Sequence, residues 1–322
     1  MQLILDTRGL KLALKDGSFS LKTKEAERTI GPGRVSSILI TADCLITTGA
    51  IELAVEEGIP IIFATQPGKV VARIWSAHLK GLPELRKLQM QYSEGEEAIP
   101  FVASLMQMRI ERQLTFLRSP LWPVINEKVT TAIQTLSTAK KKMMELKPAP
   151  VEEKRNTLMG LEGSASARYW PALGSLLPAP FTFENRSRRP AMDMFNAALN
   201  YLYALLYARV ETLLMGAGLD PYIGMLHAED FKTPVLVFDF IEPFRPYAEQ
   251  FITEKIMSSE LKENCFDKKE KEVRLNREGK KLLIPGFNEF MLQTETFAGK
   301  KRLRTDHIGA SCSELVRRLR KK

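Results

Sequence analysis

The chain has 322 residues and a formal net charge of +9, with hydrophobic and charged fractions of 44% and 26% that are ordinary for a soluble globular protein. This length favours two domains over one. Three cysteines (Cys44, Cys265 and Cys312) are too few, odd in number and too far apart for a disulfide framework or a structural zinc site, which indicates a reducing compartment.

We expect neither a signal peptide nor a membrane-spanning helix from the hydropathy of the sequence. Residues 1–7 are a strand-length apolar run without the basic start and longer apolar stretch of a signal peptide. The most apolar stretch, residues 197–208, contains Asn200 and is soon followed by Arg209 and Glu211. It is too short to span a bilayer and is interpreted as a buried helix.

Residues 1–75 have the pattern of short strands. Asp16-Gly17 is a hairpin-turn dipeptide between two such strands, and residues 47–58 form the one helical pattern, with a polar start and a glycine at the end. The expected strands cover residues 3–5, 10–15, 19–21, 35–40, 59–64 and 70–75. This region therefore predicts a mostly β domain with one helix.

From Gly81 onwards the pattern changes to long amphipathic helices, and no fixed-period repeat suggests a solenoid. The expected helices cover residues 100–118, 124–144, 152–177, 193–215 and 233–257. With a linker near 76–84, we predict an α+β protein: a β-rich N-terminal domain over residues 1–78 and an all-α domain over residues 85–322.

The last 23 residues, Lys300 to Lys322, carry nine Lys or Arg against Asp306 and Glu314. A basic tail of this kind is typical of contact with phosphate. A solvated, frayed terminus accounts for the same composition equally well.

Three segments hold candidate site residues. Glu162 lies between Gly160 and Gly163 in an expected helix, and paired helical glycines suggest the close approach of another helix or a ligand. The alternative is an exposed glutamate beside two packing glycines. His227, one of three histidines, lies in a segment rich in glycine and proline, where a buried structural histidine is the simpler interpretation.

The third segment is the expected helix over residues 233–257, with Thr233 as its N-cap and Pro234 at the first helical position. Asp239 and Glu242 are three residues apart and share a face, and Pro243 is expected to kink the helix beside them. Together with Glu162 and His227, Glu242 offers a ligand set that suits manganese or magnesium better than zinc.

Two of these motifs match a known family. Gly218-Leu219-Asp220-Pro221-Tyr222 leading to His227, followed by Asp239-Phe240-Ile241-Glu242-Pro243-Phe244-Arg245-Pro246, closely resembles the signature of the CRISPR adaptation integrases, the first of the numbered CRISPR-associated proteins. Gly160–Gly163 and Arg188–Ala197 precede these motifs in the expected order. The resemblance extends into the N-terminal half, over residues 35–40, 47–50 and 58–63.

The resemblance implies a β-sandwich-like N-terminal domain, a helical catalytic domain and a homodimer in the prokaryotic cytoplasm. It implies a divalent metal, Mn²⁺ or Mg²⁺, bound by Glu162, His227 and Glu242, with Asp239 as a less certain ligand. Members insert short double-stranded DNA into a repeat array, together with a small second CRISPR-associated protein. The chemistry implied is attack of a 3′ hydroxyl on a phosphodiester of the repeat, which accounts for the need for a metal between acids.

Five arginines are expected to contact DNA phosphates: Arg168, Arg186, Arg188, Arg189 and Arg245. Each could instead form an ion pair within the protein, above all Arg245, three residues after Glu242. Two alternatives to the integrase remain: a non-catalytic basic DNA-binding scaffold of the same fold, and a metal-dependent hydrolase of small phosphoesters.

Overall fold

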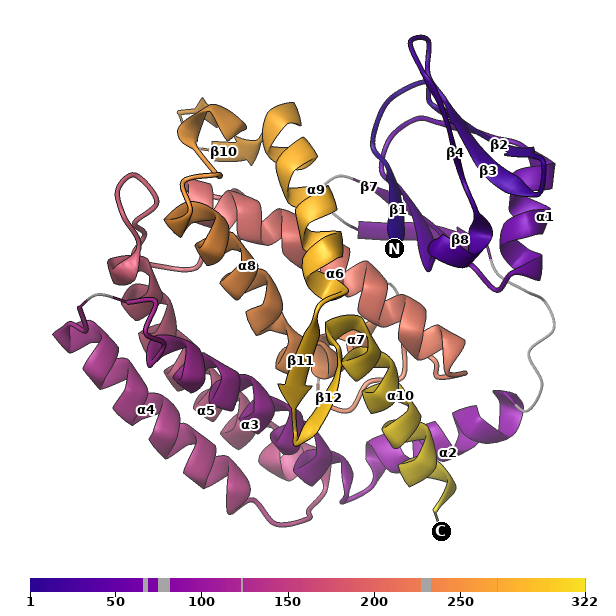
Figure 1. Cartoon of the computed structure of the whole chain (residues 1–322). Helices are drawn as coiled ribbons and strands as arrows, with labels where there is room; N and C mark the ends of the chain where they lie inside the picture. The colour runs from indigo at the N-terminus through magenta and orange to yellow at the C-terminus, as the bar shows by residue number, and fades with distance from the viewer. Residues whose placement is uncertain (66–68, 75–81, 123, 227–232, 271, 322) are drawn as a thin grey trace.

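The computed structural model describes residues 1–322 except 66–68, 75–81, 123, 227–232, 271 and 322. A strand-rich N-terminal part packs against a larger, mainly helical part (Figure 1). The predicted α+β class with a strand-rich N-terminal region is confirmed. Most of the predicted linker near 76–84 lies outside the described residues, and its last residues, 82–84, begin the first helix of the larger part. No helix in the described ranges is long and apolar enough to cross a membrane.

Two four-stranded sheets form the N-terminal part. The first has the order β1-β5-β7-β8, with β1, β5 and β7 parallel and β8 antiparallel, and the second has the order β4-β3-β2-β6. The strands are β1 (Gln2–Leu5), β2 (Lys11–Lys15), β3 (Ser18–Lys22), β4 (Glu27–Ile30), β5 (Ser37–Ile40), β6 (Leu45–Ile46), β7 (Ile61–Thr65) and β8 (Lys69–Ile74), with helix α1 (Thr48–Glu56) between β6 and β7.

Local sequence explains these elements. Asp16 and Gly17 both have positive φ, 48° and 68°, as the tight turn between β2 and β3 requires. Thr47 caps α1 by accepting a hydrogen bond from the Ala50 N–H at 3.4 Å. Leu12 and Phe19 from one sheet and Ile38 from the other are fully buried in a shared core, so the two sheets stabilise each other.

The rest of the chain is mostly helical, with two added hairpins. The helices are α2 (Leu82–Glu94), α3 (Ala98–Leu117), α4 (Glu127–Met144), α5 (Val151–Leu176), α6 (Met194–Gly216), α7 (Val235–Phe240), α8 (Arg245–Met257), α9 (Arg277–Met291) and α10 (Arg304–Arg320). The hairpins are β9–β10 (Phe266–Lys269 and Glu272–Leu275) and β11–β12 (Thr294–Phe297 and Lys300–Leu303). The prediction of a wholly helical C-terminal part therefore missed two short hairpins.

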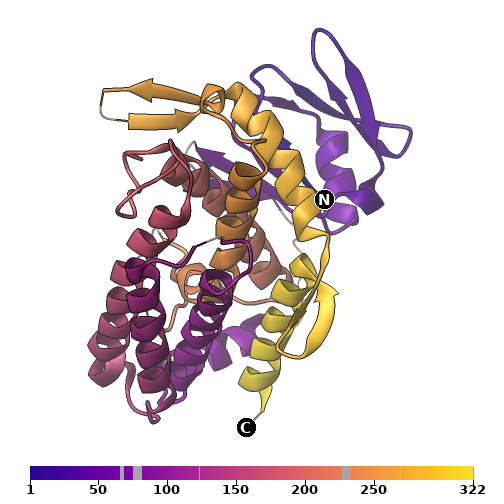
Figure 2. The same cartoon turned by 60° about the vertical axis from the view of Figure 1, so that its left-hand side comes forward.

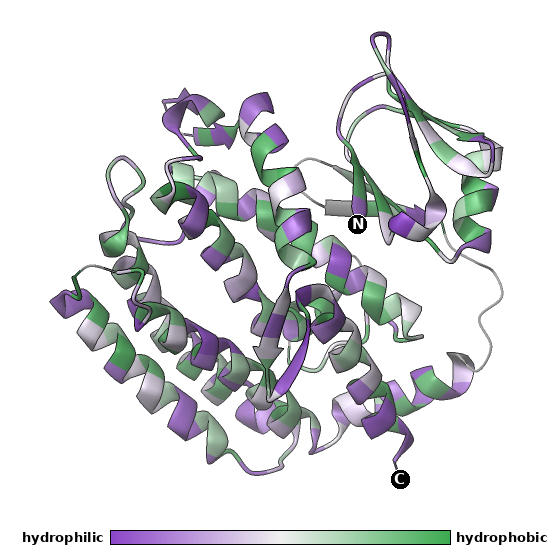
Figure 3. Ribbon diagram, viewed as in Figure 1, coloured by the Kyte–Doolittle hydropathy of each residue, from purple (hydrophilic) through white to green (hydrophobic). Residues whose placement is uncertain are grey.

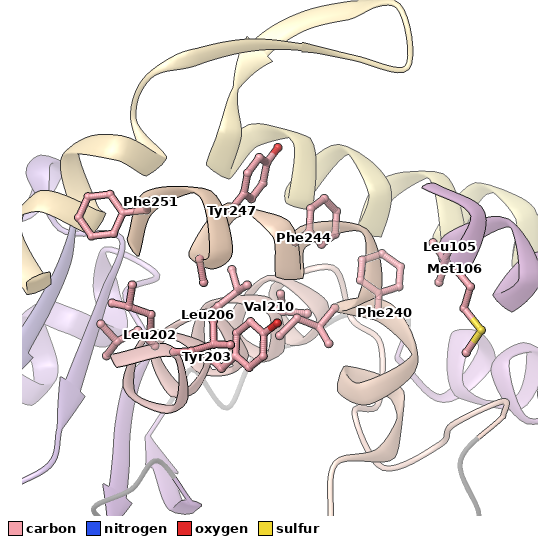
Figure 4. Close-up of a cluster of buried hydrophobic side chains, with 14 of the residues drawn as sticks. Leu105, Met106, Leu202, Tyr203, Leu206, Val210, Phe240, Phe244, Tyr247 and Phe251 are labelled. Carbon is pink, nitrogen blue, oxygen red and sulfur yellow. The ribbon is translucent and has the colours of Figure 1, made fainter. Parts of the chain in front are cut away.

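Helices α3, α4 and α5 pack side by side in a bundle, which both views show (Figures 1 and 2). Helix α6 lies between the bundle and the N-terminal part, and it packs on α8 and on strand β5. It is apolar around most of its circumference, as the hydropathy colouring shows (Figure 3), because it is covered on several sides. Leu202, Leu206 and Val210 of α6 face Phe240 and Phe244 in the buried cluster of Figure 4.

The predicted helix over residues 233–257 is broken. Val235–Phe240 is one short helix, Glu242–Phe244 is a 3₁₀ turn, and α8 begins at Arg245. Pro243 has no N–H to donate to the carbonyl of Asp239, which explains the expected irregularity at the acid pair. The predicted N-cap was wrong by one residue, since Pro234 occupies that position and makes no side-chain cap.

The basic C-terminus is not a frayed tail over the described residues. Lys300–Leu303 is a hairpin strand, and the helix α10 that follows packs against α2 and α6. Its buried face consists of Ile308, Cys312, Leu315 and Leu319. The apolar residues recur at helical spacing between the basic ones, so a count of charge alone hid an amphipathic helix.

Candidate active site

Two of the predicted site acids, Glu162 and Glu242, meet at one arginine. Glu162 lies on α5, Glu242 begins the 3₁₀ turn after α7, and Arg109 lies on α3. The Nη1 atom of Arg109 is 2.8 Å from Glu162 Oε1 and 2.6 Å from Glu242 Oε2. Residues separated by 80 positions therefore converge on one guanidinium, and their role as metal ligands stays a prediction.

Glu242 is also paired with Arg245. Its Oε1 accepts a hydrogen bond from Arg245 Nε at 2.7 Å, and Arg245 Nη2 donates to the Tyr207 hydroxyl at 2.6 Å. The alternative interpretation of Arg245, an ion pair within the protein, is thus confirmed. Burial alone would raise the pKa of Glu242, but the charges of Arg245 and Arg109 outweigh it and lower the pKa to about 2.

Glu162 differs from Glu242 in exposure. The side chain of Glu162 is 34% exposed, whereas that of Glu242 is 6% exposed. Ser166, one helical turn later, donates a hydrogen bond to Glu162 Oε1 at 2.7 Å. One oxygen of Glu162, Oε1, is therefore held by both Arg109 and Ser166, while the side chain still reaches solvent, as a group that receives a ligand must.

The glycines that flank Glu162 do not mark a packed helix. A Cβ atom added at Gly160 or at Gly163 would meet nothing within 4 Å, so the expected close approach of another helix is wrong. Gly163 instead lines an open cavity beside Glu162. The absence of a side chain there widens the entrance to the carboxylate.

This cavity, which we call the carboxylate cavity, has a volume of about 440 Å³. It is lined by Arg109, Glu162 and Glu242 together with Arg186, Arg188, Arg245, Tyr203, Leu226 and their neighbours. The third predicted ligand, His227, lies outside the described residues, and Leu226 directly before it lines the cavity. Within the described ranges no three His, Cys, Asp or Glu side chains are grouped to hold a metal.

Asp239 has a different position from the other acids. It is fully buried, and its Oδ2 accepts hydrogen bonds from the backbone N–H groups of Met225 at 2.7 Å and Leu226 at 3.0 Å. It is not among the residues that line the carboxylate cavity. Asp239 therefore holds the backbone of the segment that leads to His227, and its suggested role as a metal ligand stays a prediction.

The remaining arginines divide into two groups. Arg186 is mostly buried and donates to Asn196 Oδ1 at 2.7 Å, to Asn200 Oδ1 at 2.5 Å and to the Ser187 carbonyl. Burial lowers its pKa, and its hydrogen bonds hold the 185–200 segment together. Arg168, Arg188 and Arg189 are exposed; of these, Arg188 lines the carboxylate cavity, whereas Arg168 does not.

Sequence reasoning missed Arg109. Its helix carries buried Met106, Ile110 and Gln113, so Arg109 lies within the buried stripe. An arginine in that position needs an anionic partner, which is a signal that could have been used.

Sequence reasoning also missed Glu249, which accepts hydrogen bonds from the Tyr169 hydroxyl at 2.5 Å and the Tyr203 hydroxyl at 2.7 Å. Burial, reinforced by the charge of Glu249, raises the pKa of both tyrosines well above the usual value. The ring of Tyr203 faces Arg186 and Arg245, with guanidinium-to-centroid distances of 5.4 and 5.1 Å. Glu249 therefore fixes one wall of the carboxylate cavity.

Comparisons with known proteins cover nearly the whole chain. The family model described as "CRISPR associated protein Cas1" matches residues 3–289. A CRISPR-associated endonuclease Cas1 of Archaeoglobus fulgidus is 25% identical over 314 residues, which cover 93% of this chain and 91% of the relative. One from Thermus thermophilus is 29% identical over 295 residues, which cover 91% of this chain and 87% of the relative.

Solved structures show the same fold. A Cas1 protein from Thermotoga maritima matches with a TM-score of 0.79 and 23% identity, over 100% of this chain and 98% of that one. A casposase bound to its integration product matches with a TM-score of 0.81 and 22% identity, over 100% of this chain and 92% of that one. A Cas1-containing chain in a Cas6-RT-Cas1–Cas2 complex matches with a TM-score of 0.80 and 20% identity, covering 99% of this chain and 35% of that one.

Proposed function

The chain belongs to the CRISPR-associated Cas1 family, and from this premise we propose that it is a metal-dependent DNA nuclease and integrase. The resemblance identified from the motifs around His227 and Glu242 is confirmed by the family match. The proposed reaction joins the 3′ hydroxyl of a short DNA to a phosphodiester of a CRISPR repeat. Relatives named as endonucleases and a similar fold in a casposase bound to an integration product support this reaction class.

The observation that carries the proposal is the convergence of Glu162 and Glu242 on one cation within an open cavity. Two carboxylates from separate elements share a single Arg109 nitrogen, at 2.8 and 2.6 Å. Oxygen donors of this kind are those that Mg²⁺ and Mn²⁺ prefer. The described residues therefore fit a divalent metal that Glu162 and Glu242 would hold, with His227 as the proposed third ligand.

The protein's own residues prepare these acids. Arg245 and Arg109 keep Glu242 ionised at all physiological pH values, since its pKa is about 2. Ser166 and Arg109 orient Glu162, and Asp239 holds the backbone directly before His227. When bound, a divalent metal would polarise the phosphodiester under attack and neutralise the charge that grows on it.

The exchange of phosphodiester bonds is balanced. The attacking 3′ hydroxyl loses its proton as its oxygen bonds to phosphorus, and the displaced 3′ oxygen of the repeat leaves and takes up a proton. No bond energy has to be supplied, so placement of the two DNA segments is the main task of the protein. Arg188, exposed at the edge of the carboxylate cavity, is the phosphate contact that we favour among the five predicted arginines.

The proposed partners are double-stranded DNA with 3′ hydroxyl ends, a second copy of this chain, and the small second CRISPR-associated protein. A structural neighbour that is part of a Cas6-RT-Cas1–Cas2 complex supports the last of these. The positive net charge of +9 supports DNA.

The alternative is a basic DNA-binding scaffold of the same fold without catalysis. The ion pairs of Arg109 and Arg245 with the site acids favour it, because a scaffold needs its acids only for pairing with arginines. The integrase and the scaffold predict different effects of a divalent metal on DNA. A scaffold binds DNA equally well with Mn²⁺ or with EDTA and joins nothing.

The decisive experiment compares wild type, Glu162→Ala and Glu111→Ala in a joining assay. Purified protein with Mn²⁺ and the small partner is given 3′ hydroxyl DNA ends and supercoiled repeat DNA. Glu111→Ala is the matched control, since Glu111 is an exposed glutamate paired with Lys140 on the outside of α3. We expect joining and nicking to be lost only in Glu162→Ala, with DNA binding retained. Equal joining by Glu162→Ala and wild type would reject the catalytic site.

A further inference from the structure

A second cavity lies where α6, the N-terminal sheet and the β9–β10 hairpin meet. We call it the junction cavity; its volume is about 420 Å³. Its floor is apolar and includes Leu39 of β5, Ala64 of β7 and Val273 of β10. Ala204 and Ala208 of α6 also line it, and these small side chains leave the space open. The molecule thus keeps a hollow of ligand size between its two parts.

Cations surround this apolar floor. Among the described residues that line the cavity, Arg188, Arg189, Arg274 and Lys280 are cationic and Glu272 is acidic, and the charge of Asp6 acts on the Tyr201 hydroxyl nearby. Arg274 Nε pairs with Glu272 Oε1 at 2.8 Å, so that acid is already matched by one of the four cations. Arg188 and Arg189 are exposed. Arg188 and Arg189 therefore give the rim positive charge, which favours an anionic occupant with an apolar portion.

Tyr201 provides an aromatic surface in the same cavity. It lines the cavity beside Ala204 and is only partly buried. Lys280 Nζ lies 5.6 Å from the centre of its ring. This cation lies over one face of the ring, so a nucleobase would stack on the other face, with its phosphate near the cations of the rim.

The junction cavity and the carboxylate cavity share a wall. Arg188 lines both. Asn200 lines the junction cavity, donates to the Arg188 carbonyl at 2.7 Å and accepts from Arg186 at 2.5 Å, and Arg186 lines the carboxylate cavity. A hydrogen bond from Val273 N–H to the Ala191 carbonyl at 2.9 Å fixes the hairpin against this segment. One strand could therefore contact both cavities along Arg188.

We propose that the junction cavity binds one unstacked nucleotide of a single DNA strand, with the base against Tyr201 and phosphates at Arg188 and Arg189. A paired base cannot enter, because within a duplex both faces are covered by neighbouring bases. The strand's identity as the 3′ end that reaches the carboxylate cavity rests on the proposed function. The cavity itself requires only single-stranded DNA, and an acidic peptide, with no base to stack, is the competing occupant.

The first test uses the wild-type protein in EDTA and duplex DNA with a 3′ single-stranded overhang. A 2-aminopurine is moved along the overhang, one position at a time, and its fluorescence is measured on binding. We expect quenching by stacking at one or two adjacent positions, and an abasic site there to weaken binding about tenfold, or about 1.4 kcal/mol. If no overhang position shows quenching, or if every abasic site is neutral, the nucleotide site is rejected.

The second test fills or strips the cavity. Ala204→Phe occupies the space, and Tyr201→Ala removes the ring. Both variants should abolish quenching and lower affinity for overhang DNA about tenfold, while affinity for blunt duplex stays unchanged.

Gln134→Phe, on the exposed face of α4, is the matched control, and Tyr201→Phe should retain quenching. An equal loss for blunt and overhang DNA, or displacement of the overhang by a poly-glutamate peptide at the same charge concentration, would overturn the proposal.

Glu162→Ala separates this proposal from the proposed function. It should quench 2-aminopurine as wild type does, because Glu162 does not line the junction cavity. If Glu162→Ala still joins DNA and also quenches normally, only the catalytic role of Glu162 is rejected. If joining is normal and 2-aminopurine is quenched at no position of the overhang, only the nucleotide site is rejected.

Discussion

The carboxylate cavity and the junction cavity lie on different faces of α6, and they differ in how far their charged side chains are buried. In the first, Glu242 is almost fully buried and each of its oxygens bonds to a guanidinium. In the second, Arg188 and Arg189 are exposed over an apolar floor. The charge of Glu242 is therefore tied to folding, whereas the charges of Arg188 and Arg189 are available for binding. Substitutions should separate the two cavities by how much stability they cost.

The largest expected effect is that of Glu242→Ala. It leaves Arg109 and Arg245 buried with only the half-exposed Glu162 as counter-charge, which should lower the free energy of unfolding by about 3–5 kcal/mol. Urea denaturation followed by circular dichroism measures this loss. Glu162→Ala, whose side chain is 34% exposed, should cost about 1 kcal/mol or less. Equal losses from the two variants would contradict the distinction between the acids.

Acidification should remove the same contribution. The pKa of Glu242 is lowered from 4.5 to about 2, so its ionised form stabilises the folded state above pH 4.5, and this is lost as the pH falls towards 2. A shift of this size corresponds to about 3 kcal/mol. The measurement is the free energy of unfolding in EDTA from pH 6 to 3, for wild type and Glu242→Gln. Parallel curves for the two proteins would exclude this assignment.

A smaller effect is expected from Arg109→Gln. In wild type, a divalent metal between Glu162 and Glu242 must displace the Nη1 atom that contacts both acids. Without this competing cation, Mn²⁺ should bind about tenfold more tightly, equal to about 1.4 kcal/mol. Isothermal titration calorimetry measures the affinity, with Arg112→Gln, which lies one turn away and pairs with Glu295, as the control. Weaker Mn²⁺ binding in Arg109→Gln would show that Arg109 supports the metal.

The smallest expected effect is that of Arg188→Ala. Stability should stay within about 0.5 kcal/mol of wild type, because Arg188 is exposed. Affinity for DNA should fall a few-fold, and the slope of log affinity against log salt should become shallower by about one. Fluorescence anisotropy at several salt concentrations measures the slope. Arg168→Ala, an exposed arginine that lines neither cavity, should leave it unchanged.

Much of the fold could be read from local pattern. The Asp16-Gly17 turn and the polar start of α1 at Thr47 both act within a few residues, so their effects are visible in the sequence. The hairpins β9–β10 and β11–β12 were missed because each strand has only four residues, with few buried positions to produce a period of two. In α10, the concentration of basic residues masked the helical spacing of the buried ones.

The site was predictable in part. The motifs around Glu162, His227 and Glu242 identified the family and the two acids that converge, because a family signature preserves residue types at set spacings. Arg109 and Glu249 belong to no such motif, and their roles depend on partners 53 to 133 and 46 to 80 residues away. Asp239 was named as a less certain ligand from the resemblance, and only the structure showed that it accepts hydrogen bonds from the backbone N–H groups of Met225 and Leu226.

The sequence by itself determined the family, the helical and strand segments with strong local signals, and the two acids, Glu162 and Glu242, that the structure brings together. Only the tertiary structure decided that Arg109 lies between Glu162 and Glu242, and that α6 has a polar cavity on one face and an apolar one on another. The physical reason is that charge pairing and cavities depend on which distant side chains pack together. Sequence spacing describes only neighbours along the chain.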